Sequence, residues 1–238
     1  MLAFDFDGTL APIVAHPRAA RASLAVVRGL KSLLSTHEVA VLSGRSVDDL
    51  RTRLGFAPHH LIGNHGAEDP GCEQSRAHSA AFRARLEPVR EAALGGWAGA
   101  LSAIGVTMED RGLSLSFHYR LSRDREAARV LIAEMLQAEG QGIRAFDGKL
   151  VIHVMAVEAP GKLEALRTLM ARQGIERVLY AGDDPSDEAV FRQQGPGWFT
   201  LLVGGDARLS AAGFHLNATS DMPLFLAACR RCLRQPAG

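Results

Sequence analysis

Two carboxylates separated by a single residue lie near the amino terminus, in the run Asp5-Phe6-Asp7-Gly8-Thr9. The short apolar run Leu2–Asp5 ends at these polar residues and is predicted to be a strand. In an open parallel sheet, ligands bind at the carboxyl ends of the strands. Gly8 permits a tight turn, which would let the two carboxylates converge on one ligand. The alternative is an ordinary acidic surface turn.

Further polar residues occur at corresponding places in the chain. Ser43 follows the apolar run Glu38–Leu42, and Asp183 with Asp184 follows the run Arg177–Ala181. We therefore expect them to gather with Asp5 and Asp7 at one edge of a sheet. Lys162 opens a helix that leads back to the strand before Asp183, which places it at the same edge.

The chemistry that these residue types support is phosphoryl transfer. A hard divalent cation such as Mg²⁺ takes oxygen ligands, which Asp5 and Asp183 can supply. Ser43 and Lys162 offer a hydrogen-bond donor and a positive charge to phosphoryl oxygens. A carboxylate such as Asp5 can attack phosphorus, and Asp7 can give a proton to the leaving oxygen and later take one from water.

Alternating strands and helices at the two ends of the chain are expected to position these groups. This order predicts an α/β fold with an open, doubly wound, mostly parallel sheet and helices on both faces. Ser46 and Ser186 are candidate N-caps of helices. The expected strands are Leu2–Asp5, Glu38–Leu42, His60–Gly63, Arg177–Ala181 and Phe199–Val203, and the expected helices are Ala20–Leu34, Ser46–Leu54, Lys162–Gln173 and one opened by Asp221 and Pro223.

The middle of the chain follows a different pattern, in the order α-β-β-α-β-β. This order predicts a compact α+β module of two hairpins, each preceded by a helix, inserted into the α/β core. Asp147-Gly148 is a hairpin signal between the last two strands. The expected elements are a helix over Ser79–Ile104, strands over Val106–Glu109 and Leu113–Tyr119, a helix over Asp124–Glu139, and strands over Ile143–Phe146 and Leu150–Val157.

Bulk composition excludes several classes of protein. The chain has 238 residues, of which 47% are hydrophobic, so it can bury a full core. The 27 basic and 26 acidic residues nearly balance, which argues against a nucleic-acid or membrane-surface partner. No apolar run approaches the roughly 20 residues that span a bilayer, and the first strand begins too early for a signal peptide. We therefore expect a cytoplasmic protein, in which Cys229 and Cys232 are incidental.

In its motifs and their order, the sequence resembles the haloacid dehalogenase (HAD) superfamily. The motifs are Asp5-x-Asp7-Gly8-Thr9, Ser43, Lys162 and Gly182-Asp183-Asp184-x-x-Asp187. The resemblance implies a HAD-like Rossmannoid core over residues 1–68 and 158–238 and a cap of the superfamily's second (C2) type over residues 69–157. It implies Asp5 as nucleophile, Asp7 as general acid and base, Ser43 and Lys162 as catalytic phosphate contacts, and Mg²⁺ bound by Asp5, Asp7, Asp183 and Asp184. Direct binding of the metal by Asp184 or Asp187 and a supporting role for each stay open.

Smaller details resemble the trehalose-6-phosphate phosphatases. They are the runs Asp7-Gly8-Thr9-Leu10-Ala11-Pro12-Ile13, Ser43-Gly44-Arg45, Gly63-Asn64-His65-Gly66-Ala67-Glu68, Glu109-x-Arg111, His118-Tyr119-Arg120 and Gly182-Asp183-Asp184-Pro185-Ser186-Asp187-Glu188. The resemblance implies hydrolysis of a phosphorylated disaccharide, most closely trehalose 6-phosphate, to free sugar and phosphate. The substrate-binding residues that it implies are Gly8, Thr9, Gly44, Arg45, Asn64, His65, Glu109, Arg111, His118, Arg120 and His153.

The sequence departs from the family pattern in the region expected to read the sugar. Arg111 stands where the family usually has lysine, His153 where it has glutamate, and the following Arg-Pro is missing. These departures favour, as an alternative, another sugar or polyol phosphate as substrate. A catalytically silent sugar-phosphate-binding domain is the alternative from another functional class. Alternation along strands leaves open whether the cap residues face the cleft or solvent.

Overall fold

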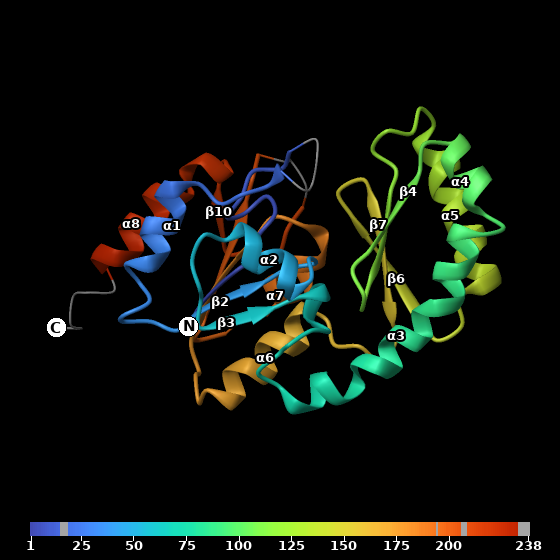
Figure 1. The fold of residues 1–238 in the computed structure, drawn as a ribbon. Helices are drawn as coiled ribbons and strands as arrows, with labels where there is room; N and C mark the ends of the chain where they lie inside the picture. Colours follow the sequence, from blue (N-terminus) through green and yellow to red (C-terminus); the bar gives the residue numbers. More distant parts are fainter. Residues whose placement is uncertain (15–18, 194, 206–208, 233–238) are drawn as a thin grey trace.

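The computed structural model describes residues 1–14, 19–193, 195–205 and 209–232. In this part of the chain, a six-stranded parallel sheet with the order β10-β9-β8-β1-β2-β3 forms the core (Figure 1). Its strands are β1 (Leu2–Phe4), β2 (Val39–Leu42), β3 (His60–Ile62), β8 (Val178–Gly182), β9 (Trp198–Val203) and β10 (Phe214–Leu216). The central position of β1 places the residues that follow it at the middle of the sheet's carboxyl edge.

Helices cover both faces of this sheet because successive strand residues point to opposite faces. Phe4 and Val41 pack toward α1 (Leu24–Lys31), α2 (Val47–Arg53) and α8 (Met222–Cys232). Ala3 and Leu42 pack toward α6 (Lys162–Arg172) and α7 (Glu188–Phe191). The predicted doubly wound α/β fold is thus confirmed.

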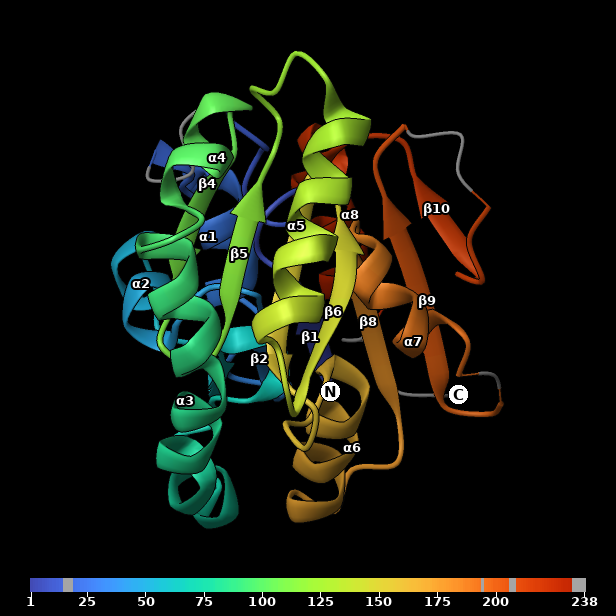
Figure 2. The same ribbon diagram turned by 90° about the vertical axis from the view of Figure 1, so that its right-hand side faces the viewer.

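A second, antiparallel sheet of four strands, in the order β4-β5-β7-β6, is inserted between β3 and α6. We call this inserted part the cap. Its helices lie on the side of the sheet away from the core, so that the other sheet face looks toward the core (Figures 1 and 2). The cap elements are α3 (Glu73–Leu94), α4 (Ala98–Ala103), β4 (Thr107–Asp110), β5 (Leu115–His118), α5 (Arg125–Glu139), β6 (Ile143–Gly148) and β7 (Val151–Ala156).

The cap has the predicted α-β-β-α-β-β order, with one extra break. The single helix expected over residues 79–104 is wrong: α3 begins earlier, ends at its C-cap Gly95, and is followed by the separate helix α4. The β6–β7 hairpin turns at Lys149 and Leu150, since Gly148 still pairs with Val151, and not at Asp147-Gly148 as predicted. The turn places Leu150 at a φ of 60°.

Two further local predictions differ from the structure. The turn after β8 is capped by the side chain of Asp184, which accepts a hydrogen bond from the Ser186 backbone N–H, so Ser186 is not the cap. Strand β10 was not predicted, because its three residues carry no clear periodicity. By contrast, Ser46 caps α2 as predicted, with its side chain accepting from the Asp49 N–H.

The two chain crossings between core and cap lie side by side. Ala67, just after β3, and Ala159, just before α6, are both buried in one small apolar cluster with the cap residues Phe82 and Met155. The domain bounds at residues 68/69 and 157/158 stay a prediction. No helix among the described residues is long and apolar enough to cross a membrane.

Candidate active site

The end of β1 delivers Asp5 to the centre of the sheet's carboxyl edge. The Asp5 N–H continues the sheet by donating to the Ala181 carbonyl at 2.8 Å, and the Asp5 side chain is buried. Lys162, the first residue of α6, places its Nζ 3.2 Å from Asp5 Oδ2 and 2.7 Å from Asp187 Oδ1. Burial raises the pKa of Asp5, and the Lys162 ammonium opposes that rise. Burial alone would lower the pKa of Lys162, but Asp187 and Asp5 raise it.

Asp187 anchors the loop that follows β8. Its fully buried carboxylate accepts hydrogen bonds from Tyr180 Oη at 2.6 Å, from Lys162 Nζ at 2.7 Å, and from the backbone N–H groups of Asp183 and Asp184 at 3.0 and 2.9 Å. Because its oxygens already accept four hydrogen bonds, Asp187 suits the role of a residue that supports the site. It orients the Lys162 side chain and holds the backbone of Asp183 in place.

Among the described residues, Asp5, Asp183 and Asp187 form a buried acidic cluster, in which one carboxylate oxygen of each residue lies within 4.8 Å of the other two. A site of carboxylate oxygens fits a hard divalent cation. Burial raises the pKa of Asp183 to about 7, against the opposing effect of Lys149. Gly8 lies against this cluster at a φ of 79°, and a Cβ there would stand 2.0 Å from Asp183 Oδ2. Only glycine leaves room for the Asp183 carboxylate.

Two predicted metal ligands have other partners in this structure. Asp184 Oδ1 accepts from the Ser186 N–H at 2.9 Å, which is a cap, and its Oδ2 accepts from the Lys149 N–H at 3.3 Å. Both oxygens of Asp7 accept from the Arg45 guanidinium. Metal binding by Asp7 and Asp184 stays a prediction.

The loop after β2 supplies Ser43, Gly44 and Arg45. Ser43 is buried, and its Oγ accepts from the Arg45 N–H at 3.2 Å. Gly44 lies under His65, since a Cβ on Gly44 would come within 2.4 Å of the His65 ring. The Thr9 hydroxyl donates to Asp183 Oδ1 at 3.4 Å, so it faces the acidic cluster.

The loop after β3 carries Asn64 and His65 in left-handed backbone conformations, with φ of 49° and 56°. Asn64 bridges core and cap: its Oδ1 accepts from Ser114 Oγ at 2.7 Å, and its Nδ2 donates to Glu68 at 2.7 Å. His65 is buried against the cap, and its two ring nitrogens have no hydrogen-bond partner among the described residues. Burial lowers the pKa of His65 well below its usual range, and His153 adds to the effect.

The core-facing side of the cap sheet carries the predicted sugar-reading residues. His153 on β7 pairs in register with Ser116 on β5, and its Nδ1 lies 2.9 Å from Ser116 Oγ. The His153 ring also lies against that of His65, with 4.3 Å between centroids. Glu109 on β4 accepts from Arg111 Nη2 at 2.8 Å and is 2.9 Å from His118 Nε2.

A cavity of about 330 Å³ lies between core and cap, near the lower end of the range for small-molecule sites. Most of the predicted residues line it. They are Asp5, Asp7, Ser43, Gly44, Arg45, His65, Arg111, His118, Arg120, His153, Lys162, Asp183 and Asp184. Gly8 and Thr9 contact the lining residue Asp183, and Glu109 contacts Arg111 and His118. Asn64 does not line the cavity and bonds to Ser114.

Sequence reasoning missed Lys149, at the tip of the β6–β7 hairpin. Its Nζ donates to Asp183 Oδ2 at 2.8 Å, so the cap contacts the acidic cluster of the core directly. The lysine follows Asp147-Gly148 in the sequence. That turn signal predicted a hairpin but not that its tip would point toward the core. Only the packing of the cap on the core shows where this tip lies.

The chain matches a protein family and several curated proteins in sequence. The family model described as Trehalose-phosphatase matches residues 3–200. A curated trehalose-phosphate phosphatase of Mycobacterium marinum is 33% identical over 93% of this chain. This chain spans 59% of the length of that relative.

Solved structures share the fold. A trehalose-6-phosphate phosphatase related protein superposes with a TM-score of 0.74 at 23% identity, and the match covers 98% of both chains. The C-terminal domain of the Candida albicans trehalose-6-phosphate phosphatase superposes with a TM-score of 0.78 at 22% identity, over 97% of this chain and 91% of that one. With the family model covering most of its length, the chain belongs to the trehalose-phosphatase family.

Proposed function

We propose that this chain is a Mg²⁺-dependent phosphatase that hydrolyses trehalose 6-phosphate to trehalose and phosphate. The observation that carries the proposal is the buried Asp5, held beside Lys162 and the Asp183 carboxylate at the base of a cavity that the cap covers. The family membership and the names of the relatives support the same substrate class.

The reaction would proceed in two displacements at phosphorus. The Asp5 carboxylate attacks, the bond from phosphorus to the sugar oxygen breaks, and Asp7 gives a proton to that oxygen. Water then attacks the aspartyl phosphate, Asp7 takes its proton, and phosphate leaves with Asp5 restored. Lys162 and Ser43 would hold the phosphoryl oxygens. When bound by Asp5 and Asp183, Mg²⁺ would offset negative charge on the phosphoryl group.

The cap would bind the sugar through side chains that are already hydrogen-bonded to one another. His118 and Arg111 share Glu109, and His153 is held by Ser116, so their side chains are oriented before a sugar arrives. Such preorganisation reduces the entropy that binding costs. His65 adds two ring nitrogens that have no hydrogen-bond partner in the described part of the chain, and a sugar hydroxyl could bond to them.

The first test is phosphate release with Mg²⁺ from trehalose 6-phosphate, compared with glucose 6-phosphate and sucrose 6-phosphate. We expect selective release from trehalose 6-phosphate. Asp5→Asn removes the nucleophile and should lower turnover by about 10⁴-fold or more. Asp48→Asn, an exposed carboxylate on α2, is the matched control and should keep full activity. A folded Asp5→Asn protein that still turns over would refute the mechanism.

A second candidate substrate is another sugar or polyol phosphate, which His153 favours because a neutral imidazole stands at the centre of the cap face. His153→Glu is the informative change. A gain in preference for trehalose 6-phosphate over other sugar phosphates would support this alternative. An unchanged preference would count against it.

A further inference from the structure

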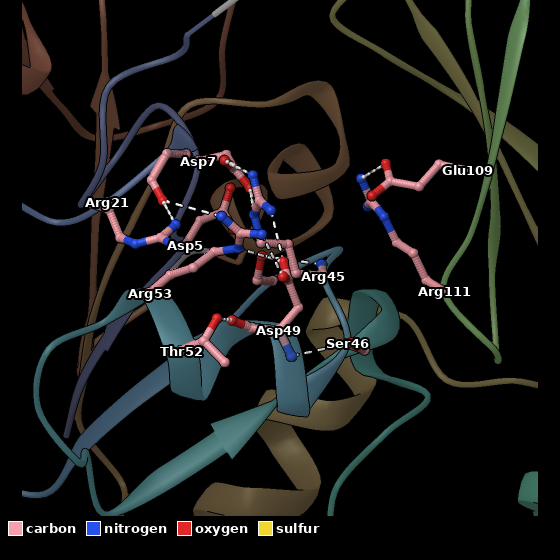
Figure 3. Close-up of polar contacts among 12 residues, drawn as sticks. Asp5, Asp7, Arg21, Arg45, Ser46, Asp49, Thr52, Arg53, Glu109 and Arg111 are labelled. Atoms are coloured by element: carbon pink, nitrogen blue, oxygen red, sulfur yellow. Dashed lines mark hydrogen bonds and ion pairs between the residues drawn. The ribbon is translucent and has the colours of Figure 1, made fainter. Parts of the chain in front are cut away.

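The guanidinium of Arg45 forms two hydrogen bonds with the carboxylate of Asp7. Its Nε donates to Asp7 Oδ2 at 2.6 Å and its Nη2 donates to Asp7 Oδ1 at 2.7 Å (Figure 3). The planar guanidinium fork matches the two oxygens of a carboxylate and fixes the orientation of both groups. The Arg45 side chain is only 4% exposed, whereas that of Asp7 is 39% exposed. The buried partner is therefore the one that sets the position of the other.

Helix α2 holds Arg45 in place. Asp49, in the first turn of α2, accepts from Arg45 Nη1 at 2.7 Å and from Arg53 Nε at 2.7 Å. The guanidinium carbon also lies 5.6 Å from the centroid of the Phe6 ring, which is between the two aspartates of the first motif. Arg45 is thus held by α2 through Asp49 and by the ring of Phe6, and its guanidinium also contacts Asp7.

The contacts of Arg45 are those of a positioning group and differ from those of a phosphate anchor. Its Nε, Nη1 and Nη2 already donate to carboxylates. Asp7 and Asp49 therefore offset the charge of the Arg45 guanidinium. Lys162, whose Nζ lies 3.2 Å from Asp5 Oδ2, and the acidic cluster are the groups to which the proposed function assigns phosphoryl transfer.

We propose that Arg45 is the positioning residue for the acid–base group Asp7, and that it acts on leaving-group protonation and not on phosphate binding. The inference rests on the proposed function, in which Asp7 protonates the sugar oxygen. A lysine could supply the charge but not the two parallel hydrogen bonds. The guanidinium geometry is therefore required.

The nature of the leaving group separates these roles. A sugar alkoxide is a poor leaving group and needs a proton from Asp7, whereas p-nitrophenolate leaves without one. The ratio kcat/KM reports the steps up to the first irreversible one, here cleavage of the bond to the leaving group. Loss of a correctly placed acid should lower kcat/KM for the sugar phosphate and spare it for p-nitrophenyl phosphate.

The experiment measures kcat/KM for trehalose 6-phosphate and for p-nitrophenyl phosphate in Arg45→Lys, Arg45→Met and Asp7→Asn. We expect a loss of about 10²-fold or more on the sugar phosphate in all three variants. For p-nitrophenyl phosphate we expect kcat/KM to fall by less than about fivefold. Arg51→Lys, an exposed arginine of α2 paired with Asp48, is the matched control and should match the wild type on both substrates.

Asp49→Asn is a second variant that leaves Arg45 and Asp7 intact and removes one brace. Its kcat/KM should fall more for the sugar phosphate than for the aryl phosphate, by a smaller factor than in the Arg45 variants. The proposal therefore stays testable even if Arg45→Met does not fold. Parallel losses on the two substrates would overturn the role of Arg45 while leaving the proposed function standing. A folded wild type that releases phosphate from neither substrate would overturn the proposed function itself.

Discussion

At the scale of single residues, the site depends on charges that support one another out of contact with solvent. Lys162 and Asp187 have side chains that are 2% and 0% exposed, and Asp5 adjoins the same ammonium. Two buried charges of opposite sign are tolerable only as a pair, since removing one leaves the other uncompensated. The position of Asp187 therefore matters even if no substrate atom touches it.

Replacing Asp187 with Asn tests this dependence. The change leaves the Lys162 ammonium with a weaker partner and disturbs the hydrogen bonds that hold the backbone of Asp183 and Asp184. We expect the free energy of unfolding to fall by about 3 kcal/mol in urea titrations. The control is Asp48→Asn, which breaks an exposed pair with Arg51 and should cost less than about 1 kcal/mol. Equal stability of the wild type and the Asp187→Asn protein would contradict this account.

At the scale of elements, the β6–β7 hairpin is the part of the cap that reaches the acidic cluster. Its tip brings Lys149 to Asp183 and the Lys149 N–H to Asp184. The helices of the cap lie on the other side of its sheet, away from the core (Figure 1). The hairpin therefore joins the cap to the acidic cluster by direct hydrogen bonds.

Lys149→Met should weaken the closed arrangement of cap and core. The variant keeps most of the apolar stem of the side chain but loses the charge-assisted hydrogen bond to Asp183. We expect KM for the sugar phosphate to rise about tenfold, which corresponds to about 1.4 kcal/mol. We also expect the radius of gyration from small-angle scattering to increase. Lys31→Met, at the end of α1, is the control; if it behaved like Lys149→Met, the hairpin contact would not be the cause.

At the scale of the whole molecule, two histidines meet where the cap rests on the core. His65 comes from the core loop after β3 and His153 from the cap strand β7, and both are buried. Burial lowers the pKa of each well below its usual range. The charged groups facing the pair are Arg111 and Lys162, with Arg144 near His65 and His118 and Glu109 near His153. Neither imidazole can accept a proton without cost while cap and core stay together.

This arrangement predicts that stability falls as pH decreases. Below about pH 6.5 the unfolded chain binds protons on both histidines, whereas the folded protein keeps them neutral. The unfolded state then binds more protons, so the free energy of unfolding drops by about 1.4 kcal/mol per pH unit for each histidine.

The measurement is urea unfolding between pH 7.5 and pH 5.5. A double variant, His65→Gln with His153→Gln, should flatten the slope relative to the wild type. His78→Gln, on an exposed part of α3, should keep the wild-type slope. A double variant whose slope equals that of the wild type would show that other groups are responsible.

Local patterns were sufficient where structure depends on neighbours in the chain. The strand ends that carry Asp5, Ser43 and Asp183 follow from short apolar runs, and the cap of α2 at Ser46 follows from one side chain. Local patterns gave wrong element bounds where one signal favours continuing an element and another favours ending it. Gly95 and Gly96 end α3 inside a stretch with helical spacing, and the β6–β7 turn lies beyond its Asp-Gly signal.

The sequence by itself determined the parallel sheet, the inserted cap and the residues gathered at one sheet edge, because parallel strands all end there. The tertiary structure alone decided which of these residues touch. Lys149 meets Asp183 across 34 residues of chain, and Arg45 meets Asp7 across 38. Such contacts depend on how the cap sheet settles on the core sheet and how α2 packs against β1. The periodicity of apolar residues along the chain does not predict that packing.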